Sequence, residues 1–159
     1  MQIVVATDLS LRSHSALRRA GLLAQASGAA LTLVHVVDED QPASLIELET
    51  REAARILDEQ IAAVPELRNL RCRAAVIPGD PHAGILRAAE SANAALIVMG
   101  SHRRQLRLDI FVGTTIERVI RAAAFPVLMV NRSADQPYQS AVAAVETTDL
   151  SADAIRTAQ

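Results

Sequence analysis

The chain has 159 residues, of which 50% are hydrophobic and 21% charged, so its length and composition suit one globular domain with a real core. Its formal net charge of −2 and its aromatic content of 2% argue against a nucleic-acid binder, which needs basic surfaces and stacking side chains. A single cysteine, Cys72, excludes an intramolecular disulfide and suits a reducing compartment. With no signal-peptide pattern and no apolar run long enough to span a membrane, we expect a cytoplasmic protein that does not contact membranes.

Strand and helix patterns alternate along the chain, which predicts βαβ units and a parallel sheet covered on both faces. Continuous apolar runs mark the buried strands, and spacing of three to four residues marks the helices. Gly28 ends the first helix and Pro65 stops the second. The predicted order is strand 2–7, helix 12–28, strand 30–37, helix 44–63, strand 70–77, helix 81–92, strand 95–100, a helix after Thr114, and strand 126–130.

The segment 70–77 differs from the other strands because its residues alternate. Arg71 and Arg73 fall on one side and apolar residues, including Cys72, on the other. This pattern is typical of an edge strand half exposed to solvent. Cys72 is expected to serve there as a small apolar core residue.

Residues 95–131 contain the strongest ligand-binding pattern. A short apolar run stops at Gly100, and Gly113 with Thr114 precedes the next helical pattern. Thr114 is a natural N-cap, and a helix start with free N–H groups beside a glycine favours an anion. The expected apolar face of this helix consists of Ile116, Val119 and Ile120.

These residues resemble the universal stress protein family. Its nucleotide-binding members carry Gly, two residues, Gly, nine residues, then Gly followed by Ser or Thr, and Gly100, Gly113 and Thr114 fit that spacing. Other stretches resemble the family's first, second and last strands and the turn after its third strand; they are 4–10, 33–36, 126–130 and 79–81. The resemblance covers about residues 1–132. It implies a five-stranded parallel, doubly wound (Rossmann-like) α/β sheet in the order 3-2-1-4-5, with helices on both faces.

In that strand order the ligand is expected where the first and fourth strands end, at Asp8 and Gly100, because their helices leave on opposite sides. The resemblance implies a stress-response regulator that binds ATP or a related adenine nucleotide, with Mg²⁺ accompanying ATP. Asp8 and backbone groups of Val36 would hold ribose and adenine, and the glycine-containing loop would hold the phosphates. The candidate ligand residues are Thr7, Asp8, Val36, Met99, Gly100, Arg103, Gly113, Thr114 and Thr115.

Each of these residues also has an ordinary structural role. Asp8 would cap the following turn, Val36 would be a buried strand residue, and Gly113 with Thr114 would form a helix cap that needs no ligand. Arg103 stands where the family motif has its second glycine. Its side chain would either block the backbone from the phosphates or bind them bidentately through its guanidinium. Arg104 and Arg107 are expected to be solvated.

No catalytic or metal-binding pattern is found. His35 and His102 have no second His, Cys or acidic residue at ligand spacing on the same element. Ser10 has no assigned base, and no Ser-His-Asp or Cys-His arrangement can be inferred from spacing. We therefore do not predict an enzyme, and expect at most slow ATP hydrolysis.

The second hypothesis is a universal stress protein that has lost nucleotide binding and acts as a dimeric interaction module. The apolar strand 126–130 would be a sheet edge, and the resemblance implies a homodimer that pairs this edge across a two-fold axis.

The tail, 133–159, is interpreted as a linker and the truncated start of a second copy of the domain. Residues 138 positions apart match without gaps, among them Val4 with Val142, Ala6 with Ala144, Ser13 with Ser151, Arg18 with Arg156, and, conservatively, Asp8 with Glu146. The alternative is a loosely structured extension, because richness in alanine inflates such matches. A truncated repeat could not bury its own apolar face and would be disordered or borrow a neighbour's surface.

Overall fold

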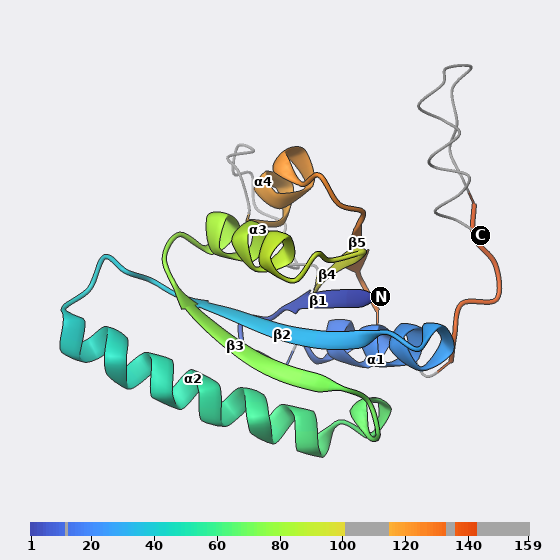
Figure 1. Cartoon of the computed structure of the whole chain (residues 1–159), viewed down its shortest axis with the longest axis horizontal. Helices are drawn as coiled ribbons and strands as arrows, with labels where there is room; N and C mark the ends of the chain where they lie inside the picture. Colours follow the sequence, from blue (N-terminus) through green and yellow to red (C-terminus); the bar gives the residue numbers. More distant parts are fainter. Residues whose placement is uncertain (12, 101–114, 133–135, 143–159) are drawn as a thin grey trace, which may run out of the picture.

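The computed structural model describes residues 1–11, 13–100, 115–132 and 136–142. Its five strands form one parallel sheet in the order β3-β2-β1-β4-β5, which confirms the predicted fold (Figure 1). Every predicted element is present, with its ends shifted by at most two residues. The elements are β1 (Gln2–Ala6), α1 (His14–Ser27), β2 (Ala30–Val37), α2 (Ala43–Ala63), the 3-10 turn η1 (Pro65–Leu67), β3 (Cys72–Pro78), α3 (Pro81–Ser91), β4 (Leu96–Gly100), α4 (Thr115–Ala122) and β5 (Val127–Val130).

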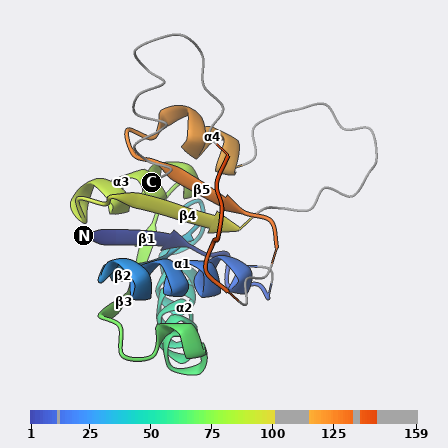
Figure 2. The ribbon, with the colours of Figure 1, turned by 90° about the vertical axis from the view of Figure 1, so that its right-hand side faces the viewer.

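Helices cover the sheet in two layers. Helices α1 and α2 lie on one face, and α3 and α4 lie on the other (Figures 1 and 2). Alternate residues of β1 separate into the two cores, with Ile3 and Val5 facing α1 and Val4 and Ala6 facing α3 and α4. Such two-sided burial explains why the central strands are continuously apolar.

The strand register brings the carboxyl ends of the central strands together. Ala6, the last residue of β1, lies opposite Val34 of β2 and Met99 of β4. The chain therefore leaves the sheet at Asp8 and at Gly100 on the same edge, on either side of the strand-order reversal. This edge is the switch point of a doubly wound sheet.

Strand β3 is the edge strand that its alternation predicted. Cys72 and Ala74 pack against the core under α1 and α2, whereas Arg73 is exposed on the opposite face. Burial raises the pKa of the Cys72 thiol, as expected of a packing residue.

The predicted apolar face of α4 is wrong at one position. Ile116 and Val119 are buried, but Ile120 is 50% exposed. One helical residue turns the side chain by about 100°, so Ile120 follows Val119 onto the outer flank of α4.

Helix ends follow their local sequence. Gly28 adopts a left-handed conformation with φ of 66°, and its N–H donates to the Ala24 carbonyl to close α1. Helix α3 begins at Pro81, with Asp80 as its N-cap. Among the described residues, no helix is both long and apolar enough to cross a bilayer.

The chain after β5 returns to α1. Arg19 of α1 donates a hydrogen bond to the Gln136 carbonyl, and its guanidinium lies 3.7 Å from the centre of the Tyr138 ring. Residues 136–142 form neither helix nor strand. Most of the segment compared with the start of the chain, 143–159, lies outside the described residues, so the second-copy hypothesis stays a prediction.

Candidate functional site

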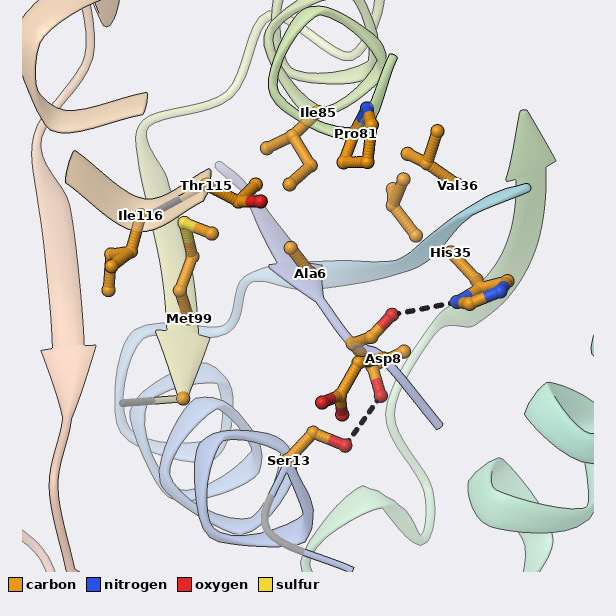
Figure 3. A pocket seen from close by; sticks show the side chains of 13 residues that line it. Ala6, Asp8, Ser13, His35, Val36, Pro81, Ile85, Met99, Thr115 and Ile116 are labelled. Carbon is orange, nitrogen blue, oxygen red and sulfur yellow. Dashed lines mark hydrogen bonds between the residues drawn. The ribbon is translucent and has the colours of Figure 1, made fainter. Parts of the chain in front are cut away.

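A cavity of about 290 Å³ lies at the switch point, between the carboxyl ends of β1, β2 and β4 and the first turns of α3 and α4 (Figure 3). Six of the nine predicted ligand residues line it, and they come from four separate segments. They are Thr7, Asp8, Val36, Met99, Gly100 and Thr115. The other three, Arg103, Gly113 and Thr114, lie outside the described residues.

The turn after β1 is held by its own hydroxyl groups. The Ser13 hydroxyl donates to the Ser10 carbonyl at 2.7 Å, so the Thr7 hydroxyl is the donor in its 2.7 Å bond with Ser13. Thr7 also accepts the Leu9 N–H at 3.0 Å, and Leu9 has a positive φ of 62°. Since Thr7 and Ser13 are buried, these bonds fix the turn, and with it the place of Asp8 at the cavity.

Asp8 is a carboxylate poised for hydrogen bonding. Its Oδ1 accepts the Ser10 N–H at 3.1 Å and the Ser10 hydroxyl at 2.6 Å. Partial burial opposes ionisation, but these hydrogen bonds outweigh it and hold the pKa of Asp8 below its ordinary value. The predicted turn-capping role is thus present. Both Ser10 bonds end on Oδ1, and within the described residues no hydrogen bond ends on Oδ2, which can accept a donor from a ligand.

Val36 lies where β2 extends beyond β1. The Val34 carbonyl accepts the Thr7 N–H, and in a parallel ladder the peptide groups of every second residue point the same way. Val36 therefore directs its N–H and C=O toward the cavity side. Neither has a backbone partner beside β1 in the described part of the chain.

His35 explains this free peptide edge. Its Nδ1 bonds to the Thr7 carbonyl at 2.9 Å, and it is the donor because a carbonyl only accepts (Figure 3). That carbonyl would otherwise be the natural acceptor for the Val36 N–H as the ladder continued. The imidazole thus takes the place of a ladder bond and leaves Val36 available to a planar polar ligand.

The opposite wall is apolar. Pro81 and Ile85 of α3 and Met99 of β4 face the cavity across from the β1 turn (Figure 3). Helix α3 approaches β2 closely because residue 84 is glycine, where a Cβ would lie 2.8 Å from Val36 Cγ2. The arrangement combines an apolar slot with polar groups on one side, as in most small-molecule sites.

Charged groups join α3 and α4 beside this wall. Asp80 accepts the N–H groups of His82 and Ala83 at 3.0 and 3.1 Å, is in contact with the His82 ring, and pairs with Arg118 of α4 at 3.1 Å. The Ala83 N–H, then His82 and Arg118, lower the pKa of Asp80 to about 2. Since Arg118 lies one turn after Thr115, this pair helps to position the first turn of α4 at the cavity.

Part of the cavity lining was not predicted from the sequence. Ser13, Pro81 and Ile85 lie at the starts of α1 and α3, and the position of these helix starts relative to the carboxyl ends of the strands was not considered. His35 was considered only as a metal ligand, although its position next to Val36 in the sequence could have indicated that it lies at the cavity. Within the described residues no group of three His, Cys, Asp or Glu side chains could hold a metal ion.

Comparison with known proteins gives consistent results. The model of the universal stress protein family matches residues 1–131. A universal stress protein of Methanocaldococcus jannaschii is 26% identical in an alignment 153 residues long, and the match covers 82% of this chain and 94% of the relative. A solved structure from the universal stress protein family of Burkholderia pseudomallei is 31% identical, with a TM-score of 0.67, covering 82% of this chain and 96% of that one.

A further solved structure is described as a universal stress protein in complex with cAMP. It is 25% identical and has a TM-score of 0.63, with 82% of this chain and 96% of that chain covered. The sequence match, the strand order and these likenesses agree over the same part of the chain. This chain belongs to the universal stress protein family.

Proposed function

We propose that the protein binds ATP or a related adenine nucleotide in the switch-point cavity and acts as a stress-response regulator. The observation that carries the proposal is the pairing of an apolar slot with the unpartnered peptide edge of Val36. Adenine presents a flat apolar face and a polar edge, so it matches both features. The relative solved with cAMP supports this ligand class.

Ribose would lie toward Asp8, whose Oδ2 accepts a hydroxyl proton. The phosphates would extend past Gly100 toward the start of α4, where Thr115 borders the cavity. Arg103, Gly113 and Thr114 are the proposed phosphate ligands of the connecting loop, by backbone N–H, hydroxyl or guanidinium. Mg²⁺ would enter on the phosphates of ATP rather than on a preformed set of protein carboxylates.

Calorimetric titration with Mg-ATP, ADP and AMP tests the proposal. We expect binding in the micromolar range, weakened about tenfold by Asp8→Ala, the loss of one good ligand hydrogen bond (about 1.4 kcal/mol). Asp58→Ala on the exposed side of α2 is the matched control and should bind as the parent does. Absence of both heat and thermal shift with all three nucleotides would refute the proposal.

Arg103→Ala decides how the phosphates are held. Lost affinity would make the guanidinium a phosphate ligand in place of the family's glycine. Retained or improved affinity would assign the phosphates to backbone groups, since alanine removes the obstructing side chain.

The second candidate function is a dimeric interaction module that works through β5 without nucleotide. It is favoured by Met129, which is 42% exposed on an edge strand that otherwise contains valine and leucine. Light scattering of the parent and of Met129→Glu tests it. If the parent is a dimer that Met129→Glu dissociates, and if the parent binds no nucleotide, the second candidate is supported over the first.

A further inference from the structure

The free edge of β3 borders a second recessed surface, separate from the switch-point cavity. A groove of about 350 Å³ runs between β3 and α3, above the face of β3 that carries Arg73 and Ile77. Helix α3 covers β1 and β2 but leaves this strip of the sheet open, and Figure 1 shows β3 on the outer side of β2. We call this surface, lined chiefly by Arg73, Ala75, Ile77 and Arg87, the β3 groove.

The backbone beside the groove offers a pairing edge. The Leu31 N–H donates to the Arg71 carbonyl and the Gly79 N–H to the Val37 carbonyl, so the odd-numbered residues of β3 pair with β2. By the alternation of a parallel ladder, the peptide groups of Cys72, Ala74 and Val76 point away from the sheet. They have no backbone partner among the described residues. Such an edge can accept another strand.

Two arginines mark the ends of the groove. Arg73 is held across the sheet by its Nε, which donates to the buried Thr32 hydroxyl at 2.9 Å and leaves both terminal nitrogens for an anion. Arg87 approaches the other end, where one terminal nitrogen lies 3.4 Å from the Pro78 carbonyl. Neither forms an ion pair with a carboxylate in the described parts of the chain.

We propose that the free edge of β3 binds an extended acidic segment of a partner protein as a sixth strand, with acidic side chains that reach over the β3 groove. Positions 73 and 78 are about 17 Å apart at the rise of a strand. Carboxylates four residues apart on one face of the added strand span about 13 Å, and their side chains cover the rest. Ala75 and Ile77 supply the apolar floor between the two charges.

Charge argues against a second copy of this chain as the occupant. Pairing two β3 edges about a two-fold axis would bring the arginines of both grooves together. In the described part of the chain neither arginine is ion-paired with a carboxylate, although Glu39 lies near Arg87. An acidic strand instead meets a cation at each end of the groove. The proposal is independent of the nucleotide site.

A synthetic peptide tests the proposal by fluorescence anisotropy with the full chain. The probe is a twelve-residue peptide of alternating threonine and valine with glutamates four positions apart. The control peptide has the same composition with the glutamates three positions apart, which places them on opposite faces. We expect the probe to bind at least tenfold more tightly. Equal binding of the two peptides, or no binding at millimolar concentration, would overturn the proposal.

Variants identify the surface. Arg73→Glu combined with Arg87→Glu should weaken the glutamate peptide at least tenfold and make a lysine version of it the better ligand. Arg132→Glu, an exposed position outside the groove, should change neither. Rescue by the lysine peptide shows that the double variant is folded. Unchanged binding of the glutamate peptide to the double variant would contradict the proposal.

Ala74→Pro separates strand addition from charge attraction. It removes an N–H that points outward, a position at which edge strands tolerate proline. In a variant whose melting temperature stays close to that of the parent, the peptide should bind at least several-fold more weakly; unchanged binding would exclude a sixth strand. A concentration-dependent dimer that the double arginine variant abolishes would assign the edge to a second copy and overturn the proposal.

Discussion

Among the described residues, the face of the sheet under α1 and α2 is closed by buried leucines, whereas the buried core under α3 and α4 contains no leucine and borders a cavity. Leu17, Leu31, Leu33 and Leu57 have 0–1% exposure on the first face. Within the described ranges each face buries four alanines, and the second fills the rest of its smaller core with valine, isoleucine and methionine. The first face therefore supplies more of the burial energy, and the second provides space for a ligand.

The two faces also differ in how their helices are held. On the first face, the turn that leads into α1 is fixed by buried hydroxyl bonds within residues 7–13. On the second, α3 and α4 are joined by exposed charges that lie 38 residues apart, Asp80 and Arg118. The hydroxyl bonds are insensitive to solution conditions, while the Asp80–Arg118 pair, like the Arg18–Glu66 pair between α1 and η1 on the first face, responds to pH and salt.

The largest expected difference between the two faces is in the stability lost when a core side chain is shortened to alanine. Leu17→Ala should lower the free energy of unfolding by about 3–5 kcal/mol, and Ile85→Ala by about 2 kcal/mol, because Ile85 already borders a cavity. Urea denaturation of both variants measures this. Ile120→Ala, at an exposed position, is the control and should change stability by less than about 0.5 kcal/mol. Equal decreases in the free energy of unfolding at Leu17 and Ile85 would show that the two faces are packed equally tightly.

A medium effect is expected where α3 touches β2. Gly84→Ala should cost about 1–3 kcal/mol of stability, because the new methyl group would overlap Val36. Helix propensity alone predicts the opposite, a gain of about 1 kcal/mol. Thermal melting of Gly84→Ala, Val36→Ala and the double variant separates the two effects. The double variant should recover most of the stability lost in Gly84→Ala. A Gly84→Ala variant more stable than the parent would show that α3 does not pack tightly against β2.

The smallest effect concerns the charges between α3 and α4. Asp80→Asn keeps an N-cap side chain but removes the charge that faces Arg118, so it should lower the melting temperature slightly at neutral pH and low salt. Because the folded-state pKa, about 2, lies below the ordinary value, this stabilisation is complete above about pH 4 and is lost as pH falls through 2.

Melting curves from pH 6 to pH 2, at low and high salt, check this expectation. The difference between parent and Asp80→Asn should shrink toward pH 2 and also at high salt. Arg118→Ala should resemble Asp80→Asn at neutral pH, since it removes the other half of the pair. A difference that stays constant with pH would show that Asp80 acts through its cap alone.

The sequence was sufficient for the strands and the helices, because those features follow from local pattern, and six of the predicted ligand residues line one cavity. Continuous apolar runs specify buried parallel strands, and Asp80 with Pro81 specifies a helix start. The edge position of β3 was also visible, because Arg71 and Arg73 interrupt one side of that strand. Ile120 was misplaced because apolar character does not reveal how far a neighbouring element extends.

Only the tertiary structure decided which polar groups at the cavity lack a partner among the residues that the structure describes. The free peptide edge of Val36 arises because β1 ends before β2 and because His35 takes the Thr7 carbonyl, a contact across 28 residues. The link from Asp80 to Arg118 and the close approach at Gly84 likewise join segments that no local pattern relates. The sequence by itself determined which strands form and, to within two residues, where they end, since backbone preference and hydrophobic patterning are local properties. Which polar groups remain unpaired at those ends depended on the packing of distant segments, and so only the folded chain decided it.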